Sequence, residues 1–395
     1  MRQLPPATTV LQVIPDLNSG GAERTTLDVA RALVQAGSSA LVVSEGGQLV
    51  PELEATGAEH IVLPVKSKNP ITLWKNASAL SDLIATRHVD IIHARSRAPA
   101  WSALRAARRT KIPFVTTYHG TYNQSNGLKA FYNSVMARGD AVIANSRFIA
   151  DLIASRHPQS AARITVIPRG SDLKSLAPEN VSALRQQALK DSWGVPAGRP
   201  IILNMARLTA WKGQKILIDA MVNLKSMGLK DPIAILAGDA QGRDGYVAEL
   251  KKMIADHELQ EQVRLVGHCA DVPAALALAD VSVVASVEPE AFGRAAVEAQ
   301  AANVPVIVSD HGAVPETVLA PPETCEGGRT GWRVPPGSAV ALADAIQNAL
   351  LLPQDARKEL TGRARTHVEQ NFSVETMCAR TLAVYANLLD QAASG

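Results

Sequence analysis

Short apolar runs alternate with helical segments along most of this chain, and this alternation constrains the fold more than any other feature. In the first half the runs cover residues 9–15, 40–44, 60–64, 89–93, 114–118, 141–145 and 164–167. The second half repeats the pattern at residues 201–205, 233–237, 264–266, 281–285 and 304–308. Runs of this length, separated by helices, are typical of parallel strands that are buried on both faces. The sequence therefore predicts an α/β protein with open, doubly wound parallel sheets.

The length of 395 residues exceeds what one ordinary hydrophobic core supports, so two domains are expected. A polar stretch at 174–191 and a Pro-Ala-Gly turn at 196–198 mark the boundary. We predict a Rossmann-like domain over residues 1–172, a linker over 173–198, and a second Rossmann-like domain over 199–371. Residues 372–395 are expected to form a final amphipathic helix.

The charge of the chain is distributed unevenly, although the net charge is only +3. Residues 1–170 carry 19 Lys and Arg against 11 Asp and Glu, a net of +8. Residues 171–395 carry 21 against 26, a net of −5. A basic first half suits anionic lipid, acidic glycan or nucleic acid, and charge alone does not choose among them.

Two segments of the basic half combine cationic and aromatic residues. In the first, Trp101 and Leu104 are surrounded by Arg95, Arg97, Arg105, Arg108, Arg109 and Lys111. The second, residues 128–136, is amphipathic and contains Phe131 and Tyr132. Such segments fit a helix lying on an anionic bilayer surface, and ordinary solvated helix faces are the alternative.

The sequence predicts a cytoplasmic protein with peripheral contact at the inner face of the cell membrane. Pro5, Pro6 and Pro15 interrupt any apolar leader segment, and the longest apolar stretch, residues 274–287, is too short to span a bilayer. The three cysteines are far apart and match no metal or redox spacing, which indicates free thiols.

Residues 281–299 read as a strand, a loop and an Ala-rich helix, with Glu290 in the loop and Glu298 about two turns into the helix. A helix that begins beyond a strand's C-terminal end directs its N–H groups at an anion. Two carboxylates flanking such a site could bind two sets of hydroxyls, which suits a sugar nucleotide. The alternative is that Glu298 is a solvated helix residue and Glu290 an acid facing the helix dipole.

Three other strand ends carry candidate site residues. Gly20 and Gly21 permit close approach of a phosphate or sugar to backbone amides, but they form no Gly-x-Gly-x-x-Gly motif and could mark a simple turn. His119, before Gly120, could serve as a hydrogen-bond donor, as a base or structurally. Arg207 and Lys212 are placed for a diphosphate.

Taken in order, these residues resemble a known family, the retaining glycosyltransferases of family 4 with the two-domain GT-B fold. The resemblance covers nearly the whole chain. It rests on the segments 20–23, 118–120, 167–170, 206–208 with 212–213, 290–298 and 331–337. The chain departs from the family pattern at Ala206, Arg169 and Ala313, and no departure removes a charged donor contact.

The resemblance implies a role for each candidate residue. Arg207 and Lys212 would hold the donor diphosphate, helped by the backbone of Phe292-Gly293 and of Gly20-Gly21. Glu298 would bind the ribose hydroxyls, and Glu290 would bind hydroxyls of the transferred sugar. His119 would lie beside the reacting centre, and the segment that includes His268 would frame the base. The last helix would pack back on the first domain.

The resemblance also implies the reaction, most closely that of mannosyl- and glucosyltransferases of the lipopolysaccharide core. The donor would be GDP-mannose or a UDP-hexose, and the acceptor a lipopolysaccharide-core, lipid-linked or other cell-envelope glycan. No cofactor, metal or nucleic acid is expected, and no Asp-x-Asp motif suggests a metal. Two other classes stay open: a sugar-nucleotide epimerase or phosphorylase using the same fold, and a non-catalytic sugar-nucleotide binding protein.

Overall fold

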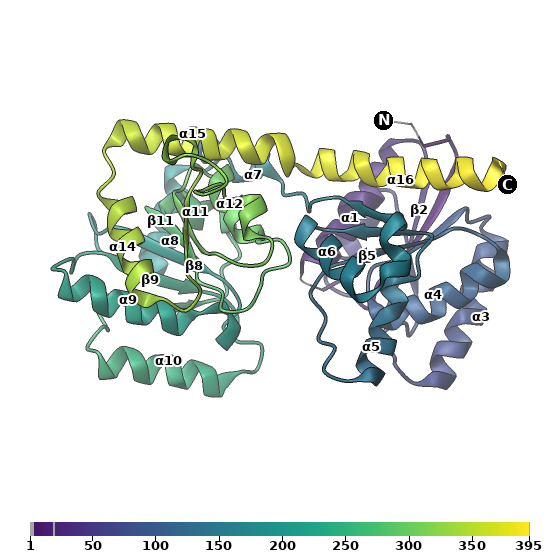
Figure 1. Ribbon diagram of the computed structural model, residues 1–395, viewed down its shortest axis with the longest axis horizontal. Helices are drawn as coiled ribbons and strands as arrows, with labels where there is room; N and C mark the ends of the chain where they lie inside the picture. Colours follow the sequence, from purple (N-terminus) through teal and green to yellow (C-terminus); the bar gives the residue numbers. More distant parts are fainter. Residues whose placement is uncertain (1–3, 19, 395) are drawn as a thin grey trace. The chain divides into compact units, whose positions relative to one another are not determined.

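A computed structural model describes residues 4–18 and 20–394, and the chain divides into two units. The first unit runs to Gly170 and also contains the residues from Val374 onward, whereas the second unit is Ser171–Ser373. The range 173–198, which the sequence suggested as a linker, contains the helices α7 (Leu173–Leu176) and α8 (Ala183–Ser192) of the second unit. Figure 1 shows both units.

The first unit is a seven-stranded parallel sheet in the order β3-β2-β1-β4-β5-β6-β7. Its strands are β1 (Thr9–Val13), β2 (Ser39–Ser44), β3 (Glu59–Val62), β4 (Ile91–Ala94), β5 (Phe114–Tyr118), β6 (Ala141–Ala144) and β7 (Ile164–Val166). Its helices are α1 (Gly21–Gln35), α2 (Val50–Glu54), α3 (Pro70–Thr86), α4 (Arg97–Thr110), α5 (Gly127–Ser134), α6 (Arg147–Arg156) and α16 (Val374–Ser394). The strand order reverses at β1 and β4, which is the arrangement of a doubly wound fold.

The second unit is a six-stranded parallel sheet in the order β10-β9-β8-β11-β12-β13. Its strands are β8 (Ile201–Met205), β9 (Ile233–Ala237), β10 (Val263–Gly267), β11 (Val281–Val284), β12 (Val306–Ser309) and β13 (Trp332–Val334). Besides α7 and α8, its helices are α9 (Gln214–Ser226), α10 (Asp244–Asp256), α11 (Val272–Leu278), α12 (Arg294–Ala301), α13 (Val314–Thr317), α14 (Ala339–Leu350) and α15 (Gln354–Asn371).

Burial explains why apolar runs located the strands. Strands β4, β5, β6, β9 and β11 are buried at every position, since helices cover both faces of each sheet. The predicted α/β class and both parallel sheets are confirmed. Strand β13, which the sequence pattern missed, has only three residues, and one of them is the charged Arg333, so it lacks the apolar signature.

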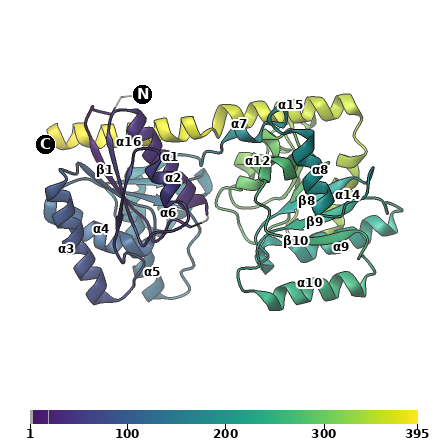
Figure 2. The same cartoon turned by 180° about the vertical axis from the view of Figure 1, so that it is seen from behind.

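The final helix begins at Val374 rather than at Phe372. Phe372 ends α15 and is buried in the core of the second unit, where its ring lies 5.5 Å from that of Phe292. Helix α16 instead packs beside α1 in the first unit (Figures 1 and 2). Its Tyr385 is fully buried there. Amphipathic periodicity shows that a helix has an apolar face, but it does not show which core that face joins.

Candidate active site

The loops that follow β8 and β11 bring Lys212 and Glu290 into contact, although 78 positions separate them. Lys212 ends a 3₁₀ turn (Ala210–Lys212), and its ammonium group forms an ion pair with Oε1 of Glu290. The same ammonium lies 4.1 Å from the centre of the Trp211 ring. Both charged side chains are mostly buried, so the pair is shielded from water and holds the two loops in one geometry.

Gly213 allows these two loops to approach. Its φ is +70°, and a Cβ placed there would come within 1.8 Å of the Ala285 carbonyl oxygen. Any larger residue would therefore push the Lys212 turn away from the end of β11. The backbone N–H of Val287 also donates to the carbonyl of Trp211 at 2.8 Å.

Ser286 and His311 fix the position of Glu290, and the sequence reasoning did not name either residue. The Ser286 hydroxyl donates to Oε1 of Glu290 at 2.6 Å. His311 donates from Nε2 to the Ser286 carbonyl at 2.9 Å, and the N–H of Ala313 donates to the carbonyl of Glu290 at 2.9 Å. A signal was available, because Ser286 and His311 each lie just past the C-terminal end of a parallel strand.

Arg207 is exposed in the loop after β8. The guanidinium of Arg207 makes no hydrogen bond or ion pair with any residue that the structure describes. The carbonyl of Arg207 accepts a hydrogen bond from Nε2 of Gln214 at 3.0 Å. A guanidinium fork next to a strand end can bind a diphosphate in two-point fashion. Arg207 is thus the available cation here, whereas Lys212 is held by Glu290.

Glu298 lies about one turn into α12, because that helix begins at Arg294 rather than at Gly293 or before. Its side chain is 17% exposed and accepts an ion pair from Nε of Arg294 at 3.0 Å. Burial raises the pKa of the Glu298 carboxyl, and the charge of Arg294 partly opposes that rise. Glu298 is therefore not the fully solvated helix residue of the alternative interpretation.

The remaining predicted residues of the second unit are Phe292, Gly293 and His268. The first two could bind a ligand only through their backbone, and the third is exposed to solvent. Phe292 is buried in the core, so only its main chain could reach a ligand. Gly293 caps α12 with φ +86° and offers no side chain to the N–H groups of Arg294 and Ala295, which could therefore face an anion; the N–H of Ala296 donates to the Gly293 carbonyl at 3.0 Å. His268 is exposed just after β10.

In the first unit, His119 contacts Arg169. Nη2 of Arg169 lies 3.0 Å from Nδ1 of His119. A guanidinium only donates, so Nδ1 accepts and the ring proton is on Nε2. Burial, Arg169 and Arg95 together hold the pKa of His119 well below its ordinary value. The neutral imidazole therefore offers an N–H and no free lone pair, which suits hydrogen-bond donation better than base catalysis.

The Nε2 atom of His119 is buried and has no hydrogen-bond partner within the described part of the chain. Gly20 and Gly21 lie at the N-terminus of α1, and Gly21 is in close contact with the Arg169 guanidinium. Each unit thus gathers its own predicted residues at the C-terminal ends of its strands. Within the described part of the chain, Glu298 forms its ion pair with Arg294 and none with Lys212.

Two Rossmann-like units with basic and acidic side chains at their strand ends are the architecture of the GT-B glycosyltransferases, and solved glycosyltransferases share it over nearly the whole chain. The family model for Glycosyltransferase Family 4 matches residues 19–175, and that for Glycosyl transferases group 1 matches residues 185–367. The chain therefore belongs to this glycosyltransferase family.

Known relatives agree with that assignment. A crystal structure of a glycosyltransferase from Rickettsia africae is 35% identical, covers 97% of this chain and 99% of its own, and has a TM-score of 0.88. The structure of Alr3699/HepE from Anabaena in complex with UDP and glucose is 25% identical, with coverage of 96% and 100% and a TM-score of 0.81. The lipopolysaccharide core biosynthesis mannosyltransferase LpsB of Rhizobium meliloti is 28% identical and covers 87% of this chain and 92% of its own.

Proposed function

We propose that this protein transfers a hexose, mannose or glucose, from GDP-mannose or a UDP-hexose to a hydroxyl of a cell-envelope glycan, with retention of anomeric configuration. The observation that carries the proposal is the Lys212–Glu290 pair beside the available Arg207, at the strand ends of a glycosyltransferase family member. The UDP and glucose bound to the Anabaena relative support the donor class. The name of the Rhizobium relative supports mannose as the sugar through its mannosyltransferase activity, and a cell-envelope acceptor through its place in lipopolysaccharide core biosynthesis.

The proposed step forms one C–O bond and breaks another on the same face of the sugar. The bond from the anomeric carbon to the diphosphate breaks, and the acceptor oxygen bonds to that carbon. The acceptor proton passes to the departing phosphate oxygen. Arg207, Lys212 and the first turn of α12 would stabilise the negative charge that develops on the diphosphate, which is the electrostatic contribution that such sites supply. Glu290 would hold the transferred sugar, and Glu298 the ribose.

A screen of UDP-, GDP- and ADP-sugars by thermal shift, followed by NMR of the product linkage, tests the proposal. We expect one donor class to raise the melting temperature and the product to keep the donor's anomeric configuration. An epimerase would instead convert the sugar nucleotide without releasing nucleotide. A non-catalytic binding protein would show the thermal shift without turnover in the presence of any acceptor fraction.

Activity is expected to survive excess EDTA, because Arg207 and Lys212 would neutralise the diphosphate charge without a metal ion. Within residues 4–18 and 20–394 there is no group of three or more His, Cys, Asp and Glu that could hold a metal. The measurement is the initial rate before and after chelation, with Mg²⁺ and Mn²⁺ added back. Complete loss of activity that either ion restores would contradict metal independence.

The proposed place of action is an anionic membrane surface, contacted by what we call the α3–α5 face: Ile71, Trp74, Trp101, Leu104, Arg105, Arg109, Leu128, Phe131 and Arg138. None of the described helices is long and apolar enough to cross a bilayer. Ile71 is 66% exposed, Trp74 53% and Phe131 60%, which is unusual for large apolar side chains. A groove of about 360 Å³ between α3 and α4 lies beside them, lined by Trp74, Trp101 and Arg105 among others.

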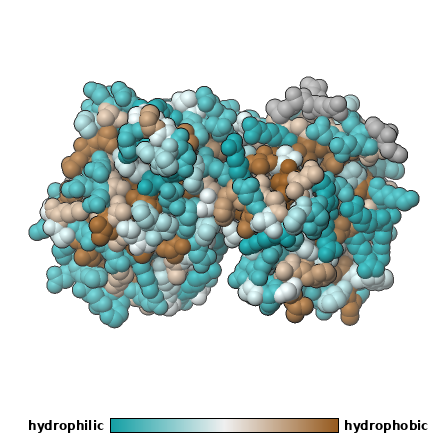
Figure 3. All heavy atoms as spheres, in the orientation of Figure 1, coloured by the Kyte–Doolittle hydropathy of each residue, from teal (hydrophilic) through white to brown (hydrophobic). Residues whose placement is uncertain are grey.

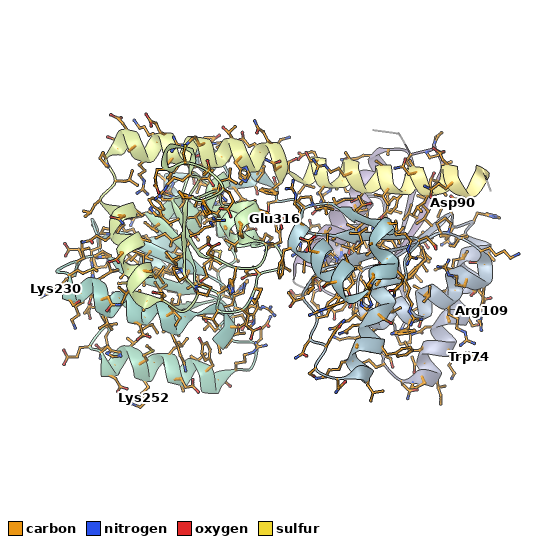
Figure 4. The ribbon with its side chains drawn as sticks, viewed as in Figure 1. Trp74, Asp90, Arg109, Lys230, Lys252 and Glu316 are labelled. Atoms are coloured by element: carbon orange, nitrogen blue, oxygen red, sulfur yellow. The ribbon has the colours of Figure 1, made fainter. Side chains whose placement is uncertain are left out.

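The two basic and aromatic segments do lie together, as the charge pattern suggested. The rings of Trp101 and Phe131 are 5.1 Å apart, and the Arg138 guanidinium lies 5.2 Å from the Trp101 ring. Figure 3 shows apolar residues at the ends of α3 and α5, and Figure 4 places Trp74 and Arg109 at the same edge of the unit. Cationic and aromatic side chains on one face complement an anionic lipid surface.

Several cations of the predicted cluster do not contribute freely to this face. Arg95 is buried at the end of β4, because its side chain points into the unit and bonds to Gln12. Arg97 is half-buried, with its guanidinium 4.3 Å from the Tyr122 ring. Arg108 forms an ion pair with Asp140 at 2.9 Å, which reduces the positive charge that Arg108 adds to the α3–α5 face. Arg105 and Arg109 are the exposed cations of α4 that remain.

The Arg105→Ser/Arg109→Ser double variant should bind anionic vesicles about 30-fold more weakly, because each basic residue near such a surface contributes about 1 kcal/mol. The wild-type protein should sediment with anionic but not zwitterionic vesicles, and high salt should release it.

The charge-matched control is Lys251→Ser/Lys252→Ser on α10, where both side chains are exposed in the second unit. This control should bind like the wild type. Equal loss in both double variants would indicate attraction by net charge alone, and no sedimentation of the wild type at low salt would make the α3–α5 face an ordinary solvated surface.

A further inference from the structure

Gln214, the first residue of α9, is a buried polar side chain that connects three segments of the second unit. It is 0% exposed. Its Nε2 donates to the carbonyl of Arg207 at 3.0 Å, and the hydroxyl of Tyr246 in α10 donates to its Oε1 at 3.1 Å. A carbonyl oxygen only accepts, so the amide nitrogen must face Arg207 and the amide oxygen must face Tyr246. Both ends of the Gln214 side chain are therefore bonded in one orientation.

A polar side chain at this position requires an explanation, because α9 otherwise buries an apolar face. The other residues that α9 buries are all apolar, namely Leu217, Ile218, Ala220, Met221 and Leu224. Burying an amide costs free energy that its hydrogen bonds only offset, and an apolar side chain of similar size would avoid that cost. The hydrogen bond of Gln214 leads to the main chain of Arg207, the available cation of the candidate active site.

The main chain around Arg207 is also held from its other side, by the segment that ends β9. The N–H groups of Ala206 and Leu208 donate at 3.0 Å each to carbonyls at the end of β9 and just past it. Gly238 allows the close contact, because a Cβ there would come within 1.8 Å of the Ala206 carbonyl oxygen and 3.3 Å of Cα of Arg207. The backbone of Arg207 is thus fixed, whereas its side chain is exposed.

We propose that Gln214 is a positioning residue for glycosyl transfer. By holding the Arg207 carbonyl, Gln214 fixes the main chain from which the guanidinium reaches the donor diphosphate, and Tyr246 holds Gln214 in turn. A cation on a main chain that is already ordered loses less conformational freedom on binding, which strengthens its interaction with the diphosphate. The inference rests on the proposed transfer and on the role of Arg207 in it, and it adds two residues that act through Arg207.

Gln214→Met is the first test, since it keeps the approximate length of the side chain and removes both hydrogen bonds. We expect kcat/KM to fall about tenfold, the upper range of what a single neutral hydrogen bond contributes. The affinity for UDP or GDP, whichever the donor screen selects, should fall by a similar factor in calorimetry. The free nucleoside should inhibit the variant as well as it inhibits the wild type, because it carries no diphosphate for Arg207 to bind.

A double-variant cycle with Arg207→Ala tests whether Gln214 acts through Arg207. Once the guanidinium is absent, the position of the Arg207 main chain no longer affects the diphosphate. Arg207→Ala/Gln214→Met should therefore have a kcat/KM within about twofold of Arg207→Ala alone, because residues that act through one another are not additive. If the two losses instead multiply in full, Gln214 supports the site independently of Arg207, and the inference is wrong.

Gln262 provides the matched control, because it is also buried in the second unit and also donates to a main-chain carbonyl. It is 6% exposed, and its Nε2 donates to the Lys230 carbonyl at 2.8 Å. It precedes β10, so it lies at the end of the sheet opposite to the loops that follow the strands. Gln262→Met should lower the melting temperature as Gln214→Met does, but it should leave kcat/KM and nucleotide affinity unchanged.

Tyr246→Phe keeps the ring and removes only the hydroxyl, so it also tests the inference if Gln214→Met does not fold. Its kcat/KM should fall about threefold, less than in Gln214→Met, because the bond to Arg207 remains. If Arg207→Ala loses activity while Gln214→Met or a sole folded Tyr246→Phe matches the wild type, the inference is wrong and the proposed function stands. If Arg207→Ala turns over normally, Gln214 has no cation to position. A wild type that binds no nucleotide sugar would refute the proposed function itself.

Discussion

Replacing Arg207 by Ala is expected to lower kcat/KM by at least about two orders of magnitude, the scale on which removal of one charge-stabilising group acts. The guanidinium has no hydrogen-bond or ion-pair partner within residues 4–18 and 20–394, so its loss leaves no buried group unsatisfied. We therefore expect an unchanged melting temperature, which makes this variant a clean test of diphosphate binding. The measurement is a steady-state assay with the donor identified by the nucleotide-sugar screen.

Lys212→Ala should reduce kcat/KM at least as much, but for two reasons that can be separated. It removes a cation proposed to bind the diphosphate, and it leaves the mostly buried Glu290 with Ser286 as its remaining side-chain partner. The second effect should lower stability by roughly 1–3 kcal/mol, the cost of an unsatisfied buried group. Arg207→Ala has only the first effect, so comparing the two variants isolates the positioning of Glu290.

Lys215 is the control for both variants, since its exposed ammonium pairs with Glu249 on a neighbouring helix. Exposed ion pairs contribute little to stability, so Lys215→Ala should leave kcat/KM and melting temperature nearly unchanged. If Arg207→Ala and Lys212→Ala both turn over normally, the diphosphate lies elsewhere. If Lys215→Ala loses activity equally, the general positive potential of α9 is responsible.

Glu298→Gln is expected to weaken binding of UDP or GDP by roughly 1–3 kcal/mol, because a charged acceptor of two ribose hydroxyls becomes a neutral one. The substitution keeps the size of the side chain, and Arg294, its partner, is exposed and can be solvated in the variant. Calorimetry with the free nucleoside diphosphate measures the effect without chemistry. If a folded Glu298→Gln variant binds the nucleotide with unchanged affinity, Glu298 does not contact the ribose.

The pH dependence of the same measurement gives an independent check. Burial raises the pKa of Glu298 above that of an ordinary glutamate, so its carboxyl begins to take up a proton at a higher pH than usual. Wild-type nucleotide affinity should therefore begin to fall at a higher pH than an ordinary glutamate would give, and Glu298→Gln should lack this component of the pH dependence. Arg294→Gln serves as the control, because it keeps the carboxylate and should stay within a few-fold of the wild type.

The local pattern of the sequence was enough to locate every strand of both sheets except β13. Parallel strands covered by helices must be apolar at nearly every position, so runs such as 114–118 and 281–285 are visible without any knowledge of their neighbours. The ends of these strands also identified Glu290, Arg207 and Lys212 as candidates, because the edge of a parallel sheet at which strands end is where loops present side chains. The family assignment followed from the same segments.

Tertiary structure decided which side chains meet. Nothing local indicates that Lys212 pairs with Glu290, that Ser286 and His311 fix that pair, or that Arg207 is left available. The position of Arg95 was misread for the same reason: one residue past a strand, its side chain turns inward to Gln12, 83 positions away, instead of outward to the basic face. Composition and spacing describe the chemistry that a residue can perform, whereas long-range packing sets its burial, its partners and therefore its charge state.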